Sequence, residues 1–190
     1  MNAYDLFMSP LEMIILKKLR RELIPKSTGD VLEIGIGTGV NFGLYNYNNV
    51  KSYIGLDVEI SSKAKEIQKS NQTLVAGVAE NLPFKDNSFD TVVVTLVLCS
   101  VQDRHKSLDE IYRVLKPEGN LIFIEHILSD KNIIGKLFHK VDNSWNRFTK
   151  CTLCSQTDEL IKNSKLKIKY IDKKAAGILC YGIASKSRKI

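Results

Sequence analysis

Three glycines and two acids are the residues of this sequence whose types and spacing could do chemistry. Gly35, Gly37 and Gly39 stand at alternate positions directly after a short apolar run that contains Glu33. Glycines at such a turn let the backbone bend sharply and approach a ligand closely. A glycine turn after the first strand of an open α/β sheet is the usual place for a nucleotide cofactor. The second acid, Asp57, ends the next apolar segment.

The glycine spacing narrows the choice of cofactor. A dinucleotide fingerprint requires a third glycine three residues after the second, and Val40 occupies that position. The phosphate-cradling pattern G-x-x-x-x-G-K-[ST] does not occur in the sequence. The spacing therefore argues against an NAD-dependent enzyme and against a P-loop.

The position of Asp57 suits the binding of a ribose. A carboxylate at the end of the second strand can accept hydrogen bonds from two ribose hydroxyls, and such charged bonds contribute roughly 1.5–3 kcal/mol each. Taken singly, Asp57 also fits a loop aspartate at a strand end, and Glu33 fits a charge near a helix N-terminus. Their combination with three glycines favours a cofactor site.

The elements that must position these residues alternate between strands and helices. Continuous β-branched runs such as Val92–Val94 indicate strands that are covered on both faces, as in a parallel sheet. The order predicts a three-layer α/β sandwich with a mainly parallel sheet. The expected strands are 31–34, 52–56, 73–76, 89–98, 121–125, 166–171 and 178–184, and the expected helices are 10–23, 61–70, 103–115, 131–147 and 157–163.

Length and composition bound the class of protein. The chain has 190 residues, 44% of them hydrophobic and 26% charged, which is typical of a globular domain. We expect one domain over 1–190, with an N-terminal lid helix in 1–25, a cofactor-binding core in 30–126, and substrate-side helices with the last two strands in 127–190. Four cysteines are too few for a disulfide scaffold. Because no signal peptide or membrane-length apolar run is visible, we expect a soluble, cytoplasmic protein.

The net charge of +7 is concentrated at one end of the chain. Residues 1–130 carry a net charge of −3, and residues 131–190 carry +10. A basic end can serve nucleic acid, anionic lipid or an anionic substrate. Lysines also alternate with apolar residues over 165–170, as in a half-exposed strand, which favours a solvated face. A non-catalytic protein that binds nucleic acid or an anionic membrane surface through this region is the alternative function.

Four stretches of the sequence resemble class I S-adenosylmethionine-dependent methyltransferases. They are the glycine turn with its strand at 31–39, Ala-Glu-Asn-Leu-Pro-Phe at 79–84, the segment 86–90, and Arg-Val-Leu-Lys-Pro-Glu-Gly at 113–119. The resemblance covers about residues 30–126. It implies a Rossmann-like, seven-stranded sheet whose last strand runs antiparallel. It also implies S-adenosyl-L-methionine as the cofactor and S-adenosyl-L-homocysteine as the product.

The resemblance assigns the glycine turn and the two acids to parts of the cofactor. Glu33 would lie near the methionine amino group, and the three glycines would leave room for the cofactor. Asp57 would hold the ribose, with Val58 beside it.

Two further segments would contact the cofactor by the same resemblance. Ala79 and Glu80 would flank the adenine, with backbone atoms reading its edge. Thr95 and Leu96, at the end of the fourth strand, would approach the methionine moiety. Relatives often carry an aspartate where Val78 stands, so adenine recognition would use Glu80 or backbone carbonyls instead.

The segment after the fourth strand bears on the methyl acceptor. Enzymes of this class that methylate amide or exocyclic nitrogens usually carry Asp/Asn-Pro-Pro-Tyr/Phe there, and cytosine-ring enzymes carry Pro-Cys. Residues 95–101 read Thr-Leu-Val-Leu-Cys-Ser-Val, so no nucleic-acid acceptor is expected. The segment is similar to alkyl-thiol S-methyltransferases and bacterial phospholipid N-methyltransferases, and more distantly to ubiquinone/menaquinone-biosynthesis C-methyltransferases. A small or lipophilic acceptor follows: a thiol, an amine or a phospholipid head group.

An amine or thiol acceptor must lose a proton, because a thiol with a pKa of about 8.5 is only a few per cent ionised at neutral pH. His126, at the expected carboxyl end of the fifth strand, is the first candidate base, and Asp142 is the second. A histidine packed under a helix is the alternative for His126. Cys151 and Cys154 form a lone C-x-x-C. Because a structural zinc needs four ligands, no metal site is expected.

The amphipathic helix 10–23 has two interpretations. It can fold over the cofactor as a lid, which we favour because its apolar face is needed for packing. It can instead make peripheral contact with an anionic membrane through Lys17, Lys18, Arg20 and Arg21. The sequence leaves the oligomeric state open.

Overall fold

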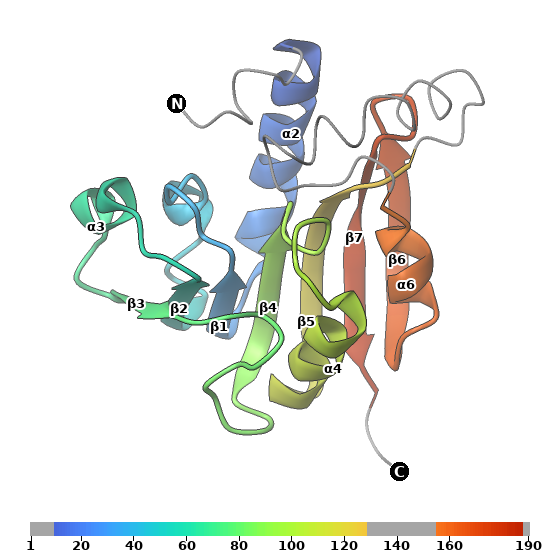
Figure 1. The fold of residues 1–190 in the computed structure, drawn as a ribbon. Coiled ribbons are helices and arrows are strands. Elements are labelled where there is room, and N and C mark those ends of the chain that lie inside the picture. Colours follow the sequence, from blue (N-terminus) through green and yellow to red (C-terminus); the bar gives the residue numbers. More distant parts are fainter. Residues whose placement is uncertain (1–9, 129–154, 188–190) are drawn as a thin grey trace.

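Seven strands form one sheet in the order β3-β2-β1-β4-β5-β7-β6 (Figure 1). The computed structural model describes residues 10–128 and 155–187. The strands are β1 Gly29–Ile34, β2 Val50–Asp57, β3 Gln72–Ala76, β4 Phe89–Thr95, β5 Leu115–His126, β6 Leu166–Lys174 and β7 Leu179–Lys186.

Strand direction in the sheet matches the prediction. β1, β2, β3, β4 and β5 pair in parallel, and β7 runs antiparallel to both of its neighbours, β5 and β6. The seven-stranded, mainly parallel sheet with an antiparallel last strand is therefore confirmed. Because the carboxyl ends of parallel strands meet at one edge, the residues that follow β1, β2 and β4 come together there.

Helices cover both faces of the sheet, which confirms the three-layer sandwich. On one face, the buried side chains of Val92 and Val94 join a core with Ile111. On the other face, Val93 joins a core with Leu19. The helices are α2 Pro10–Leu23, α3 Ser62–Ile67, α4 Arg104–Val114 and α6 Thr157–Lys162, with short 3₁₀ turns η1 Ile24–Lys26 and η2 Phe42–Leu44.

Side-chain caps fix where two of these helices begin. The Ser61 hydroxyl accepts a hydrogen bond from the Ala64 amide at the start of α3. The Asp103 carboxylate accepts one from the Lys106 amide at the start of α4. Such caps satisfy amides that have no partner inside the helix and are each worth about 1 kcal/mol.

Some element boundaries differ from the predicted ones. The fourth strand ends at Thr95 and not at residue 98, because Leu96 takes a left-handed conformation with φ of 60° that turns the chain out of the sheet. β5 begins at Leu115 and is longer than the predicted 121–125. The predicted helix 131–147 lies outside the described residues.

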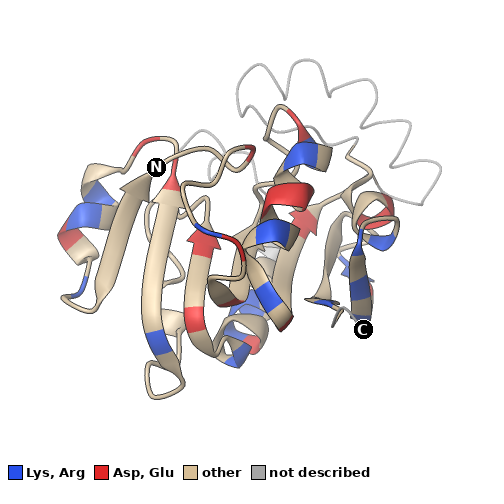
Figure 2. Ribbon diagram, turned by 90° about the horizontal axis from the view of Figure 1, so that it is seen from below, with Lys and Arg blue, Asp and Glu red and all other residues tan. Residues whose placement is uncertain are grey.

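The lysines of residues 165–170 are exposed to solvent, as the alternation of lysine and apolar residues there predicted. Lys167 and Lys169 are exposed on β6, an edge strand of the sheet, and blue bands recur along that strand in Figure 2. Lysines on an edge strand also discourage edge-to-edge pairing between molecules. Within the described ranges, no helix has both the length and the apolar character needed to cross a bilayer.

Candidate functional site

The glycine turn after β1 is tied to the end of β2 by backbone bonds. The amides of Gly35 and Ile36 donate to the Leu56 carbonyl at 2.7 and 3.3 Å. The Gly37 amide donates to Oδ2 of Asp57 at 2.7 Å. The Ser61 hydroxyl, next to α3, donates to the Gly37 carbonyl at 2.8 Å. The turn is therefore held by the last residues of β2 and by Ser61, which follows that strand.

Each glycine in the turn has a positive φ, and their surroundings differ. A Cβ added at Gly35, where φ is 72°, would lie 2.3 Å from Cγ2 of Val97. A Cβ at Gly39 would lie 2.8 Å from the Phe42 ring. A Cβ at Gly37 would meet no protein atom within 4 Å. Gly35 and Gly39 are thus required by close packing, and Gly37 faces open space.

That open space is a cavity of about 630 Å³ at the carboxyl edge of the sheet, which we call the glycine-loop cavity. Its lining comes from the ends of β1, β2 and β4, the segment after β3, and the start of α4. The lining residues are Ile34, Gly35, Gly37, Leu56, Asp57, Val58, Gly77, Val78, Ala79, Glu80, Leu96, Val97, Ser100, Val101, Gln102, Asp103 and Lys106.

Seven of the residues that the sequence singled out for the cofactor line this cavity together. They are Gly35, Gly37, Asp57, Val58, Ala79, Glu80 and Leu96. Glu33, Gly39 and Thr95 are buried close to the turn and are not part of its lining. The assignment of individual contacts to the cofactor stays a prediction.

The carboxylate of Glu33 is buried among hydroxyl and amide donors. Tyr53 and Tyr45 donate to its Oε2 at 2.6 and 2.8 Å, and Nδ2 of Asn41 donates to its Oε1 at 2.7 Å. Burial raises the pKa of Glu33, while these hydrogen bonds and the charge of Arg20 on α2 act in the opposite direction. Burial and the Glu33 charge together raise the pKa of both tyrosines.

The hydrogen bonds of Glu33 to Asn41, Tyr45 and Tyr53, which we call the Glu33 cluster, were not predicted from the sequence. The prediction placed Glu33 next to the methionine amino group of the cofactor. The rings of Tyr45 and Tyr53 also meet edge to face, with centroids 5.0 Å apart. Asn41 reaches past Glu33 to Oγ1 of Thr95 at 3.2 Å. The cluster therefore joins β1, the segment after it, β2 and the end of β4 next to the glycine turn.

The segment after β3 is anchored to α4 by charged side chains. Arg113 donates to the carbonyls of Leu82 and Phe84 at 3.0 and 2.7 Å and to Oε1 of Glu110 at 2.6 Å. Glu110 in turn accepts from the Leu82 amide at 2.7 Å. Glu80 accepts from the amide of Gln102 at 2.9 Å, so it holds the start of the α4 loop. These anchoring roles of Arg113, Glu110 and Glu80 were not predicted from the sequence.

The turn after β4 is held by a carboxylate on β5. Oε1 of Glu125 accepts from the amides of Val97 and Leu98, both at 3.0 Å, and Oε2 accepts from the Cys99 amide at 3.2 Å. Glu125 is fully buried. Leu96, which begins the turn, and Val97 both line the glycine-loop cavity.

Comparison with known proteins agrees with this geometry. A family model described as a methyltransferase domain matches residues 32–123, which include the glycine turn, Asp57, the segment after β3 and most of β5. Over these residues the chain carries a class I S-adenosylmethionine-dependent methyltransferase domain. The chain is 31% identical over 163 residues to the human thiol S-methyltransferase TMT1A, an alignment that covers 77% of this chain and 65% of the human protein.

Two further comparisons extend the likeness. The ubiquinone/menaquinone biosynthesis C-methyltransferase UbiE of Geobacter sp. (strain M21) is 29% identical over 167 residues, covering 77% of this chain and 71% of that protein. A putative methyltransferase from Bacillus halodurans superposes with a TM-score of 0.71 at 15% identity, covering 91% and 99% of the two chains, which shows a shared fold. The chain spans less than two thirds of the length of the curated relatives that it matches first: 65% of human TMT1A, 34% of the yeast mitochondrial methyltransferase OMS1 and 48% of the rat thiol S-methyltransferase TMT1B.

The glycine-loop cavity fits an adenosyl cofactor. A group can approach the backbone at Gly37 because no protein atom lies where a side chain would stand. Only Oδ2 of Asp57 accepts a hydrogen bond among the described residues, so Oδ1 is available to a ligand. Leu56, Val78 and Leu96 add apolar surface to the lining. S-adenosylmethionine is the methyl donor of this family.

The two candidate bases are not among the lining residues of this cavity, and one of them lies outside the described residues. His126, at the end of β5, is 1% exposed, pairs with Leu179 of β7, and is not in the lining. Asp142, Cys151 and Cys154 lie outside the described residues. A base role for His126 or Asp142 therefore stays a prediction.

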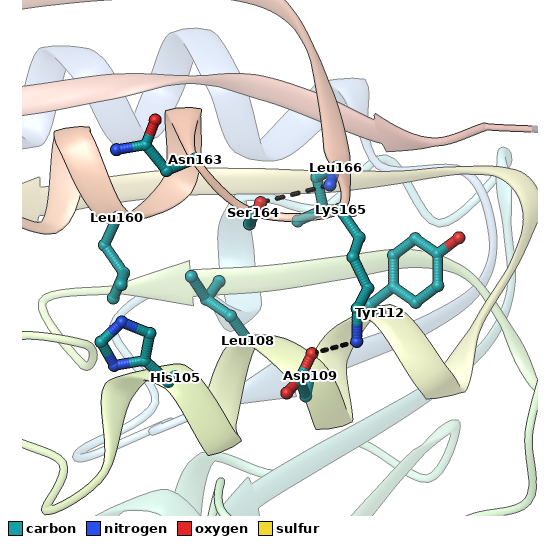
Figure 3. Close-up of a pocket in the computed structure, with 9 residues that line it drawn as sticks. All are labelled: His105, Leu108, Asp109, Tyr112, Leu160, Asn163, Ser164, Lys165 and Leu166. Carbon is teal, nitrogen blue, oxygen red and sulfur yellow. Dashed lines mark hydrogen bonds and ion pairs between the residues drawn. The ribbon is translucent and has the colours of Figure 1, made fainter.

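A smaller hollow lies between α4 and α6, on the face of the sheet (Figure 3). It has a volume of about 180 Å³. Lys165 reaches across it to Oδ1 of Asp109 at 2.7 Å and closes one end. Leu108 and Leu160 supply apolar walls, and His105 stands at the other end. Because none of the predicted site residues lines it, the glycine-loop cavity remains the candidate site.

Proposed function

We propose that the protein transfers a methyl group from S-adenosylmethionine to a small or lipophilic acceptor, namely a thiol, an amine or a phospholipid head group. The observation that carries the proposal is the meeting of Gly37 and Asp57 in one cavity, with the backbone of Gly37 open and one oxygen of Asp57 available. The likeness to thiol S-methyltransferases and to UbiE supports small acceptors.

The chemistry asked of this chain is mainly positioning. When bound, the cofactor supplies a methyl group already activated by a positively charged sulfur, so the protein needs no electrophilic catalyst. The acceptor atom must be held in line with that methyl group while water is excluded, and such positioning can supply roughly 7–11 kcal/mol of the barrier. In this chain, the rigid glycine turn, the segment 79–84 and the turn after β4 would provide that frame.

A binding measurement followed by a transfer assay tests the proposal. Calorimetry should show that S-adenosylhomocysteine binds with a dissociation constant in the micromolar range or tighter, about −8 kcal/mol. The assay then offers labelled S-adenosylmethionine with thiols, amines, quinols and phospholipids. Failure of the folded protein to bind S-adenosylhomocysteine would refute the proposal, and binding without transfer to any acceptor in the panel would refute the acceptor class.

A second property, contact with an anionic membrane surface, is favoured by the outer face of α2. Leu16, Leu19 and Leu23 are buried in the core, whereas Met13 and Ile14 are 45% and 66% exposed. Exposed cations follow on the same helix at Lys17, Lys18 and Arg21. In Figure 1 the first turns of α2 extend beyond the carboxyl edge of the sheet, where the glycine-loop cavity opens.

The same helix bears on the lid interpretation. None of its side chains over the described residues 13–23 lines the glycine-loop cavity, and its buried leucines pack on the face of the sheet. Apolar residues beside cations are typical of helices that lie in a membrane interface. We therefore propose that α2 brings the carboxyl edge of the sheet to a lipid surface that holds a lipophilic acceptor. The role of α2 as a lid over the cofactor stays a prediction.

A further inference from the structure

Glu125 is a buried acid that the proposed chemistry does not use. It is the penultimate residue of β5 and is fully buried. Its two oxygens receive three consecutive backbone amides, those of Val97, Leu98 and Cys99, at 3.0, 3.0 and 3.2 Å. A neutral carboxyl group carries its own proton on one oxygen, so three converging N–H donors suit the ionised form.

The three amides need such an acceptor because the chain leaves the sheet at this point. The Leu96 amide still bonds to the Ile124 carbonyl of β5 at 2.8 Å, and Leu96 then turns with φ of 60°. The amides of residues 97–99 therefore fall outside the strand ladder while remaining buried. A buried amide without a partner costs about 1–3 kcal/mol, so one carboxylate prevents several such losses.

The other side of the turn is closed by its own residues. The amide of Ser100 donates to the Val97 carbonyl at 2.9 Å, and the Ser100 hydroxyl donates to the same oxygen at 2.8 Å. The Val101 amide also reaches that carbonyl, at 3.2 Å. The turn is therefore a compact unit in which the backbone amides of residues 97–99 are attached to the sheet through Glu125.

This unit forms one wall of the glycine-loop cavity. Leu96, Val97, Ser100 and Val101 line it. The glycine turn forms an adjoining wall, and the two walls are in contact because a Cβ at Gly35 would lie only 2.3 Å from Cγ2 of Val97. A small displacement of Val97 toward Gly35 would therefore collide with the glycine turn, and a displacement away from it would widen the cavity.

We propose that Glu125 is a positioning residue that sets the width of the glycine-loop cavity by clamping the turn after β4. The inference rests on the proposal that S-adenosylmethionine occupies this cavity. Glu125 itself does not line the cavity, so it acts through the backbone of residues 97–99. Without the clamp, the turn samples displaced positions and the cofactor is held less firmly.

The test compares Glu125→Gln and Glu125→Leu with two controls, using S-adenosylhomocysteine as the probe. Glutamine keeps the shape and one acceptor oxygen, but its amide group faces the Cys99 N–H as a second donor. Leucine removes all three bonds. Glu118→Gln, at the exposed opposite end of β5, controls for the loss of a charge on the same strand. Val114→Ala, in the core of α4, controls for a general loss of stability.

The expected result is a graded and local effect. Calorimetry should show S-adenosylhomocysteine binding weakened about tenfold in Glu125→Gln and more in Glu125→Leu, because glutamine disturbs the bond to the Cys99 amide while leucine removes all three bonds. Hydrogen exchange of residues 96–101 should accelerate in both variants, with the amides of β1 unchanged. Both controls should bind as the wild type does, although Val114→Ala melts at a lower temperature.

Three outcomes would overturn the inference. The first is that a folded Glu125→Leu binds S-adenosylhomocysteine within about twofold of the wild type. The second is that amide hydrogen exchange of residues 96–101 does not change in the variants. The third is that Val114→Ala weakens S-adenosylhomocysteine binding as much as a Glu125 variant with the same loss of melting temperature. If Glu125→Leu does not fold, Glu125→Gln decides by the same measurements. Absence of binding by the wild type would instead count against the proposed cofactor site itself.

Discussion

The amide of Gly37 donates a hydrogen bond to Oδ2 of Asp57 across 2.7 Å, and this bond joins the turn after β1 to the end of β2. It fixes the orientation of the Asp57 carboxylate inside the glycine-loop cavity. A carboxylate that is already oriented loses little freedom when it accepts further hydrogen bonds from a ligand. The bond therefore makes Asp57 both a part of the loop and a prepared acceptor.

Replacement of Asp57 should weaken the binding of S-adenosylhomocysteine, to a degree that depends on the substituted side chain. We expect Asp57→Asn to weaken S-adenosylhomocysteine binding by about tenfold, because charged hydrogen bonds are lost while the shape remains, and Asp57→Ala by about a hundredfold. Calorimetry measures both. Asp109→Asn, which removes an acid paired to Lys165 on the surface, serves as the control and should bind as the wild type does. Equal binding by all four proteins would exclude a role for Asp57 in holding the cofactor.

Gly37→Ala should impair cofactor binding, whereas Gly35→Ala should impair stability. At Gly37 the new methyl group meets no protein atom within 4 Å, so the fold should lose only about 1–2 kcal/mol from the positive φ, while cofactor binding is blocked. At Gly35 the methyl group would lie 2.3 Å from Val97, so stability should fall by several kcal/mol through overpacking and strain.

Urea unfolding with calorimetry distinguishes the two glycine variants. We expect Gly37→Ala to unfold near the wild-type midpoint and to bind S-adenosylhomocysteine poorly. Gly35→Ala should unfold at clearly lower urea. If Gly37→Ala binds normally, the open space above Gly37 is not where the cofactor lies.

Much of the fold could be predicted because its signals are local in the sequence. The apolar run that ends in three alternating glycines marks β1 and its turn, and Asp57 marks the end of β2. The apolar run 89–98 located β4, but its end was wrong because Leu96 takes a left-handed conformation that composition does not reveal. Continuous apolar residues look alike whether they lie in a strand or just beyond it.

The supports of the site could not be predicted, because they join residues distant in sequence. Tyr45 and Tyr53 reach Glu33 across 12 and 20 positions, and only the register of β1 with β2 brings Tyr53 there. Glu125 meets Val97 across 28 positions through the pairing of β4 with β5. No local spacing encodes such contacts, although an acid within an apolar strand signals that some buried partner must exist.

Removal of the Tyr53 hydroxyl should destabilise the protein more at neutral than at acidic pH. The folded-state pKa of Glu33 is raised above its usual 4.5 by burial, so the ionised form costs stability as pH rises above that value. Tyr53 offsets this by donating to the carboxylate at 2.6 Å. Tyr53→Phe raises the pKa further, and we expect its deficit in unfolding free energy to reach about 1–3 kcal/mol at pH 7.

Urea unfolding of Tyr53→Phe and the wild type at pH 5 and pH 7 checks this prediction. The deficit should shrink toward pH 5, where Glu33 can take up a proton in the variant. Tyr47→Phe is the matched control, because the Tyr47 hydroxyl donates to the Phe42 carbonyl and not to Glu33. A deficit that does not change between pH 5 and pH 7 would show that Glu33 keeps the same protonation state in both proteins over this range, and it would contradict the prediction.

The Glu110–Arg113 pair should give stability that is lost in acid. The hydrogen bond from Arg113 lowers the pKa of Glu110 below 4.5. A depressed pKa contributes stability above the unfolded value, and that contribution disappears as pH falls through the folded value. We therefore expect Glu110→Gln to be less stable than the wild type near pH 7 and to approach it as pH falls below about 4.5.

A second ion pair of the same spacing supplies the control for Glu110. Glu159 pairs with Lys162 at 2.8 Å, but the Glu159 side chain is 58% exposed, whereas that of Glu110 is 17% exposed. Exposed pairs contribute about 0–1 kcal/mol. Urea unfolding of Glu159→Gln should therefore follow the wild type at every pH. A Glu110→Gln curve parallel to the wild type would show that Arg113 does not stabilise the ionised carboxylate.

The outer face of α2 should bind anionic vesicles and should not bind neutral ones. Each cation near an anionic surface contributes about 1 kcal/mol, so Lys17→Gln with Lys18→Gln should weaken partitioning roughly 30-fold. Met13→Ser with Ile14→Ser should weaken it at all salt concentrations, because the apolar contribution is not screened. Sedimentation with phosphatidylglycerol and phosphatidylcholine vesicles measures both effects. The control is Ile67→Ser, which removes an exposed aliphatic side chain on α3 and should partition as the wild type does. Equal binding of anionic and neutral vesicles by the wild type would contradict an electrostatic contact through α2.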